Sequence, residues 1–166
     1  MKYLLDTHVV LWFAEHSDKL SDRAYRALAD VEADVFVSIA SAWEVAIKLS
    51  TGKLDLEGGL PEFFEIVDSN GFVMLSVERE YLLQMRNLPE HHKDPFDRML
   101  IATAIVEDMT LITIDENIHK YNLSLFMVDW LSQAEQEDKE LLKSICEEDG
   151  EIAMAVVCVS PYEILT

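Results

Sequence analysis

The sequence predicts an α/β fold in which helices cover both faces of a parallel sheet, giving three layers in the order α/β/α. Short apolar runs of strand length alternate along the chain with longer segments that have helical spacing. This alternation is typical of right-handed βαβ crossovers, which build parallel sheets. The chain has 166 residues, of which 50% are hydrophobic and 27% are charged, as expected for a globular protein.

Each predicted strand is a short run rich in apolar residues. The first run, KYLLD, ends in an acid, as buried parallel strands often do. We expect strands at residues 2–6, 35–38, 72–75, 110–114 and 125–128. The central sheet therefore has about five strands.

The helices are predicted from apolar spacing and from the residues at their starts. Ser21 is a suitable cap because its hydroxyl can accept a hydrogen bond from a free backbone N–H. Pro61 and Pro95 are favoured in a first helical turn. We expect helices at residues 7–16, 21–31, 39–49, from about 61, 77–85 and 94–107.

The character of the chain changes after residue 130. Residues 131–146 resemble a polar, acidic helix, residues 147–150 a turn and residues 152–160 an apolar strand. Residues 131–166 hold nine acidic and two basic side chains. We therefore divide the chain into an α/β domain (1–130) and an acidic C-terminal extension (131–166), which we expect to act as an acidic cover or as an edge strand in an oligomer.

Composition excludes several classes of protein. The formal net charge of −19 rules out a preformed basic surface for nucleic acid, so any polyanion handled here needs metal ions or local basic patches. The apolar runs are shorter than the ~20 residues that a bilayer requires, and Asp6 interrupts the core of any signal peptide. Two cysteines form neither a disulfide framework nor a zinc set. We expect a cytoplasmic protein without membrane association.

Four acids from separate segments are expected at one edge of the sheet. Asp6 and Asp115 follow predicted strands, Glu44 lies one turn into a helix and Asp97 lies in the first turn of another. In an open α/β sheet, sites form beyond the carboxyl ends of the strands. Glu44 stands out because its neighbours are apolar, and a carboxylate there is costly unless it has a partner.

Clustered carboxylates either take up protons or bind a cation. Oxygen ligands without grouped histidine or cysteine indicate Mg²⁺ or Mn²⁺. Such an ion suits phosphate chemistry, because it polarises a phosphoryl oxygen and lowers the pKa of a bound water. We also expect Thr113 to orient a water or Asp115. The nearby cations Arg98 and Lys48 are expected either to contact an RNA backbone or to pair with helix acids.

Several of these residues have a purely structural interpretation. Asp94 before Pro95 is an ordinary helix cap, and Asp97 can complete the capping arrangement. His91 and His92, beside a helix start, are expected to be surface residues, and His8 to pack at a helix start. The aromatic residues at helical spacing are expected in the core; they are Trp12, Trp43, Phe63, Phe64 and Phe96.

Four segments together resemble the PIN-domain nucleases, and specifically the VapC-type toxins of bacterial toxin–antitoxin pairs. They are LLDTH at 4–8, SIASAWEVAIK at 38–48, HKDPFDRMLIATA at 92–104 and LITID at 111–115. Their order, spacing and context match over residues 1 to about 130, whereas the extension goes beyond the usual end of such a toxin.

The resemblance implies a function as well as a fold. It implies a five-stranded parallel sheet and a metal site formed by Asp6, Glu44, Asp97 and Asp115. It also implies an endoribonuclease that uses Mg²⁺ or Mn²⁺ to activate water, acts on RNA such as tRNA, forms a homodimer and is held inactive by a cognate antitoxin.

Two alternatives stay open from the sequence. The first is a noncatalytic protein that keeps the PIN fold for binding or regulation; the presence of all four acids argues against it. The second is a phosphatase that uses Asp6, as haloacid-dehalogenase enzymes use the acid after their first strand. Those enzymes have an Asp-x-Asp arrangement, and His8 occupies the second position here.

Overall fold

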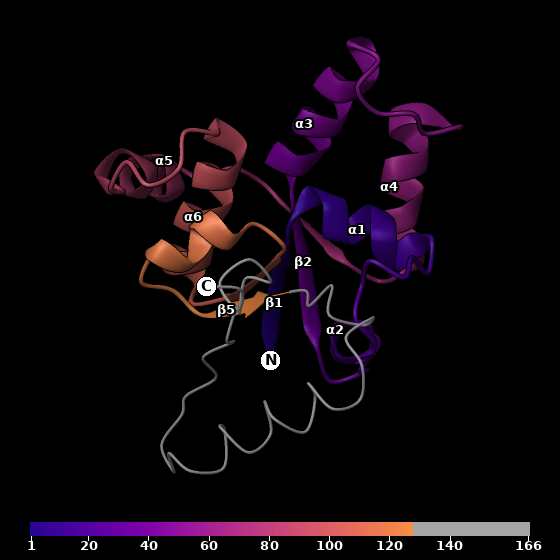
Figure 1. Ribbon diagram of the computed structural model, residues 1–166, viewed down its shortest axis with the longest axis horizontal. Helices are drawn as coiled ribbons and strands as arrows, with labels where there is room; N and C mark the ends of the chain where they lie inside the picture. Colours follow the sequence, from indigo (N-terminus) through magenta and orange to yellow (C-terminus); the bar gives the residue numbers. More distant parts are fainter. Residues whose placement is uncertain (128–166) are drawn as a thin grey trace, which may run out of the picture.

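The computed structural model describes residues 1–127. Its centre is a sheet of five parallel strands in the order β3-β2-β1-β4-β5 (Figure 1). The strands are β1 (Lys2–Leu5), β2 (Asp34–Ser38), β3 (Val73–Leu75), β4 (Thr110–Thr113) and β5 (Leu125–Met127). The predicted parallel sheet of about five strands is thus confirmed, with each strand within two residues of its expected bounds.

Six α-helices connect these strands, as the sequence predicted. They are α1 (Thr7–Ala14), α2 (Asp22–Leu28), α3 (Ile39–Ser50), α4 (Gly59–Ser69), α5 (Arg79–Asn87) and α6 (Pro95–Glu107). Ser21 caps α2 and Asp94 caps α6, both as expected. Helix α1 ends two residues early because His16 has a positive φ of 49°, which a right-handed helix cannot continue.

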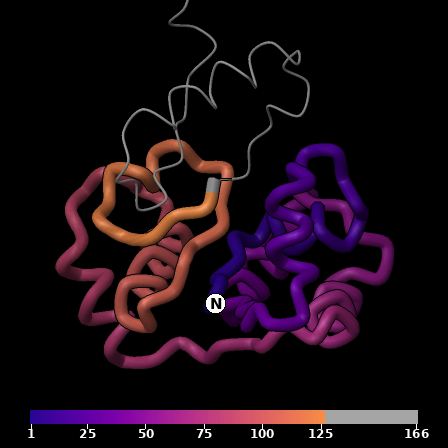
Figure 2. Tube along the Cα trace, turned by 90° about the horizontal axis from the view of Figure 1, so that it is seen from below, coloured from indigo at the N-terminus to yellow at the C-terminus, as the bar shows by residue number. Residues whose placement is uncertain are grey.

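Helices lie on both faces of the sheet (Figures 1 and 2), and the side chains of the strands alternate between these two helical layers. In β1, Leu5 packs with residues of α1, α2, α3 and α4, whereas Leu4 packs with residues of α6. Phe63 on α4 and Leu100 on α6 are among the largest fully buried side chains of the two clusters. Burial on both faces explains why the strands read as continuous apolar runs.

One aromatic prediction is wrong. Trp43 does not join the core: 64% of it is exposed, and its ring meets that of Phe96 edge to face, with centroids 5.2 Å apart. The buried face of α3 carries small residues, including Ala42 and Val45, so the helix approaches its neighbours closely there. Trp43 lies on the opposite face together with Ile47, which is also exposed.

The other aromatic residues divide between the core and its margin. Phe63 is fully buried as predicted, whereas Trp12 and Phe64 are half-buried against the same core. One element was not predicted: the 3₁₀-helix η1 (Glu116–Lys120), whose five residues are too few to show a helical period.

The predictions for the C-terminal extension concern residues beyond the described part of the chain. The expected helix at 131–146, turn at 147–150 and strand at 152–160 lie outside residues 1–127. Among the helices of that described part, none is both long and apolar enough to cross a membrane.

Candidate metal site

Asp6 lies where the strand order reverses. Strand β1 has β2 on one side and β4 on the other, and such a switch point is where ligands bind in open α/β sheets. The backbone N–H of Asp6 donates to the carbonyl of Ile112, 3.0 Å away, which extends the β1–β4 ladder by one residue. The carboxylate is 6% exposed and accepts a capping hydrogen bond from the backbone N–H of His8. Asp6 is therefore fixed by both the sheet and α1.

Thr113 connects Asp6 to Asp115. Its buried hydroxyl donates to Oδ2 of Asp6 at 2.7 Å and accepts from the backbone N–H of Asp115 at 3.0 Å. The sequence indicated that Thr113 orients a water or Asp115, and the structure gives it contact with both acids. The two acids are thus coupled by one hydroxyl although 109 positions separate them in the chain.

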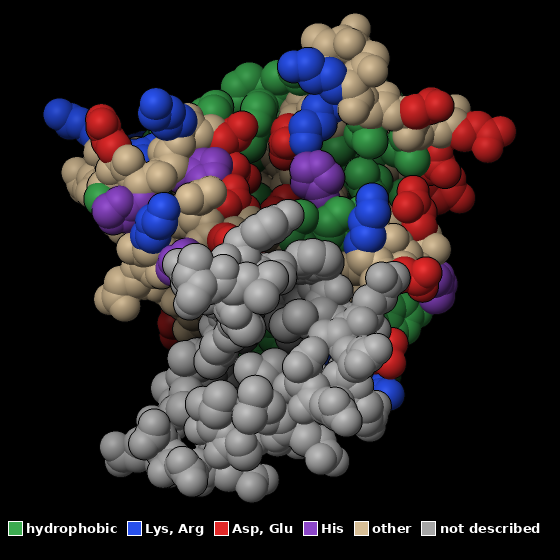
Figure 3. Space-filling view, viewed as in Figure 1, with side chains coloured by type: hydrophobic (Ala, Val, Ile, Leu, Met, Phe, Trp, Pro, Cys, Tyr) green, Lys and Arg blue, Asp and Glu red, His purple; other side chains and the backbone are tan. Residues whose placement is uncertain are grey.

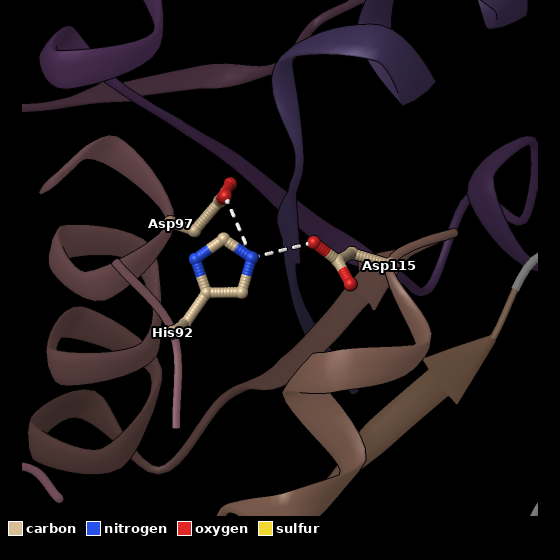
Figure 4. Close-up of side chains that lie close together, drawn as sticks. All are labelled: His92, Asp97 and Asp115. Carbon is tan, nitrogen blue, oxygen red and sulfur yellow. Dashed lines mark hydrogen bonds and ion pairs between the residues drawn. The ribbon is translucent and has the colours of Figure 1, made fainter. Parts of the chain in front are cut away.

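Asp97 and Asp115 face each other across the ring of His92 (Figure 4). His92 Nε2 lies 2.6 Å from Oδ2 of Asp115 and 3.3 Å from Oδ2 of Asp97. Asp97 lies in the first turn of α6, where Asp94 also accepts a hydrogen bond from its backbone N–H. Ligand atoms of these three residues lie within 4.8 Å of one another.

The prediction that His92 is a surface residue is wrong. Its side chain is 13% exposed, and both ring nitrogens have partners. The surrounding loop is held in place by Arg98 of α6, whose guanidinium donates to four backbone carbonyls. Those carbonyls belong to Met85, Leu88, Pro89 and His92. Arg98 therefore supports the loop that carries His92, rather than forming the ion pair with a helix acid that the sequence offered as one of its two roles.

Tyr121 supports the same loop from the other end. Its hydroxyl accepts from the backbone N–H of His92 at 2.9 Å and donates to the carbonyl of Pro89 at 3.0 Å. Sequence reasoning missed both Tyr121 and the placement of His92. The available signal was the position of His92 just before the Asp94–Pro95 helix start, which aims the loop at the first turn of α6.

Glu44 of α3 is fully partnered by α1 and by its own helix, and it lies outside the group that His92, Asp97 and Asp115 form among the described residues. Its Oε2 accepts from the hydroxyl of Thr7 at 2.6 Å, and its Oε1 forms an ion pair with Nζ of Lys48 at 2.6 Å. This satisfies the requirement that a half-buried carboxylate has partners. Of the two sequence-based roles for Lys48, the structure has the ion pair. Lys48 Nζ also lies 3.4 Å from Nε2 of His8.

The carboxyl groups differ in protonation. Burial and the nearby charges of Asp6 and Asp94 raise the pKa of Asp97 to about 7. Burial also disfavours the charged form of Asp115, but hydrogen bonds from Asn117 and His92 outweigh it and lower the pKa of Asp115 below its ordinary value. The site thus concentrates more negative charge around Asp97 than the protein neutralises by itself.

The PIN domain family model matches residues 3–123. The chain belongs to the PIN-domain family. The matched range contains all four acids, together with Thr113 and His92. PIN domains are in general nucleases, although some members are noncatalytic.

Solved structures share the fold of this PIN domain at low sequence identity. VapBC2 from Rickettsia felis, bound to a DNA fragment from its promoter, has a chain with 19% identity and a TM-score of 0.62, covering 78% of this chain and 100% of that one. VapBC-1 from nontypeable Haemophilus influenzae has a chain with 16% identity and a TM-score of 0.54, and the match covers 80% of this chain and 100% of that one. FitAcB from Neisseria gonorrhoeae has a chain with 19% identity and a TM-score of 0.52, and the match covers 75% of this chain and 96% of that one. No curated protein matches the chain.

The residues at the switch point fit a divalent cation. Acidic side chains gather in a hollow between the α1–α3 side and the α5–α6 side of this PIN domain, with histidines on both sides (Figure 3). The donor set is dominated by carboxylate oxygens, which Mg²⁺ and Mn²⁺ prefer. The charged form of Asp97 is disfavoured by burial and by the neighbouring acids. A bound cation would stabilise that charged form.

Proposed function

We propose that this PIN-domain protein is a VapC-type endoribonuclease toxin, with Mg²⁺ or Mn²⁺ held by Asp6, Glu44, Asp97 and Asp115. The observation that carries the proposal is the convergence of Asp6, Asp97 and Asp115 at the switch point, joined through Thr113 and His92. A buried, like-charged group of this kind is expensive to maintain unless it serves a ligand.

The protein groups have separate roles in the proposed reaction. When bound, the cation would polarise the phosphodiester and lower the pKa of a water nucleophile. Asp97 and Asp115 supply ligand oxygens from opposite sides of the gap. Thr113 fixes the orientation of Asp6 and the backbone of Asp115, so these ligands need little rearrangement to bind the ion.

The cationic side chains act at the edge of this site. Lys48 forms an ion pair with Glu44 and lies at the edge of the site, where its charge would also be within reach of an RNA phosphate. Arg98 acts through the loop it holds rather than by touching RNA. Because the whole chain carries a net charge of −19, RNA binding depends on the cation and on local positive charge such as that of Lys48.

We propose two protein partners, a cognate antitoxin and a second copy of the chain. The fold is shared with proteins of VapBC complexes, and exposed apolar side chains on α3 and α5 offer contact area. These side chains are Ile39, Trp43, Ile47, Leu82 and Leu83. We also propose a domain boundary near residue 130. The acidic extension after it would either cover the site or add an edge strand in an oligomer.

Cleavage of labelled total RNA and tRNA tests the proposed activity. We expect cleavage with Mg²⁺ or Mn²⁺, none with EDTA, and none by the Asp6→Asn and Asp115→Asn variants. Glu116→Gln is the matched control, because this acid is adjacent to Asp115 but exposed. If folded protein cuts no RNA with either ion, also after removal of residues 131–166, the noncatalytic interpretation replaces the nuclease.

A further inference from the structure

His92 lies in the gap between two proposed metal ligands. Its Nε2 is within hydrogen-bond distance of Oδ2 of Asp115 and close to Oδ2 of Asp97. An imidazole in that position can do one of two things. It can present a lone pair to a cation as a third ligand, or it can present a proton to the two carboxylates.

The other ring nitrogen decides between these possibilities. Nδ1 of His92 lies 3.1 Å from the backbone nitrogen of Asp94. A backbone N–H can only donate, so Nδ1 must be the acceptor and carries no proton. The ring nitrogen that carries a proton is therefore Nε2, which faces Asp115 and Asp97.

The loop gives the ring little freedom to change this arrangement. The backbone N–H of His92 is bound to Tyr121, and its carbonyl to Arg98. To offer a lone pair from Nε2, the ring would have to move its proton to Nδ1 and lose the hydrogen bond from Asp94. The neighbouring elements therefore favour a donor over a ligand.

We propose that His92 is a positioning residue whose Nε2–H lies between Asp97 and Asp115 where the cation would otherwise bind. In the metal-free protein, its Nε2–H links Asp97 and Asp115, so that a cation has to compete with this proton for the two carboxylates. A cation that binds these carboxylates displaces this hydrogen bond and is not coordinated by His92. The inference rests on the proposed cation site and deepens it.

The consequence is a preference among metals. Imidazole nitrogen is a good ligand for Zn²⁺, Cu²⁺, Fe²⁺ and Ni²⁺, whereas Mg²⁺ and Mn²⁺ suit oxygen donors. Because the only histidine in the three-residue group of the described chain keeps its proton on Nε2, the remaining donors are carboxylate oxygens. Asp94 and His92 would thus keep the site selective for Mg²⁺ and Mn²⁺.

Pulsed electron paramagnetic resonance of Mn²⁺ bound to the full chain tests this inference. We expect no coupling from a directly coordinated ¹⁴N nucleus. Calorimetric titration with Mn²⁺ should show several-fold tighter binding by His92→Ala, which removes the competing donor. His92→Gln, whose amide can donate in place of Nε2–H, should return towards the affinity of the natural chain. The matched control is His119→Ala, an exposed histidine of η1, which should bind Mn²⁺ unchanged.

The outcomes separate this inference from the proposed function. A ¹⁴N coupling that disappears in His92→Ala, with weaker Mn²⁺ binding, would overturn the role of His92 and leave the cation site intact. Absence of Mn²⁺ binding in every variant would overturn both. The spectroscopic result on the unsubstituted chain holds even if the His92 variants fold poorly.

Discussion

The two sides of the acidic hollow are neutralised in different ways. On the α1–α3 side, Glu44 has a full positive charge from Lys48 and a hydroxyl from Thr7. On the α6–β4 side, Asp97 and Asp115 share the Nε2 of a single histidine, His92. The first side is electrically balanced, whereas the second keeps excess negative charge and a pKa of about 7 at Asp97. The need for a cation is therefore concentrated on the α6–β4 side.

The largest expected effect is the loss of activity when the α6–β4 side, which has excess negative charge, loses a carboxylate. Asp97→Asn should reduce metal-dependent RNA cleavage on the order of 10³-fold, because one charged ligand is lost. Single-turnover cleavage rates measure this effect. Asp108→Asn, at the other end of α6 in a left-handed conformation that Asn tolerates, is the control and should keep full activity. Equal losses in both variants would point to damage of the helix.

The hydroxyl of Thr113 should contribute more to the free energy of unfolding than the hydroxyl of Thr7 on the other side of the hollow. Thr113→Val removes the hydrogen bond to Oδ2 of the buried Asp6 carboxylate and leaves the N–H of Asp115 without its partner, which we expect to cost about 1–3 kcal/mol of unfolding free energy. Thr7→Val should cost less, because Glu44 keeps Lys48. Urea denaturation of both variants without metal measures the difference. A larger loss for Thr7→Val would contradict the comparison.

The raised pKa of Asp97 predicts a pH effect on stability. The folded state binds a proton up to a pH of about 7, whereas the unfolded carboxyl releases it near pH 4, so this residue lowers stability as pH rises through that window. Relative to the natural chain, Asp97→Asn should therefore gain about 1–2 kcal/mol between pH 5.5 and 8 without metal, after allowance for solvent screening.

Thermal and urea unfolding across that pH range provide the measurement. The gain should shrink when Mg²⁺ is added, since the cation compensates the Asp97 charge in the natural chain. A stability difference that does not depend on pH would show that the Asp97 charge is already compensated.

The smallest effect is expected for the cation on the balanced side. Lys48→Met removes an i,i+4 ion pair at the edge of the site, and we expect a change in unfolding free energy of less than about 1 kcal/mol. Mn²⁺ affinity should rise slightly, because Glu44 loses its competing charge. A loss of several kcal/mol would mean that Glu44 depends on Lys48 as strongly as Asp6 depends on Thr113.

Local signals explain how much of the fold followed from the sequence. Each buried strand is an apolar run, Ser21 and Asp94 are caps with side-chain oxygens, and Asp6 and Asp115 follow strands directly. These features depend on residues close together in the chain. The common edge of the sheet then follows from parallel strand direction alone, so the proximity of Asp6 and Asp115, which follow adjacent strands, was predictable.

The features that were missed depend on distant contacts. His92 is half-buried because Tyr121 and Arg98 hold its loop against the site, and neither contact leaves a periodic signal in the sequence. Trp43 is exposed because the opposite face of α3 carries the small residues that allow close packing. Which face of an amphipathic helix meets the core is decided by its neighbours in space.

The most direct test of a cation on the α6–β4 side is anomalous diffraction from crystals of the full chain grown with Mn²⁺. We predict a peak bound by the carboxylates of Asp97 and Asp115 near Asp6, with the Nε2 of His92 displaced from Asp115 and outside the coordination sphere. An empty site at saturating Mn²⁺, with His92 still linking the two carboxylates, would contradict a metal-dependent nuclease.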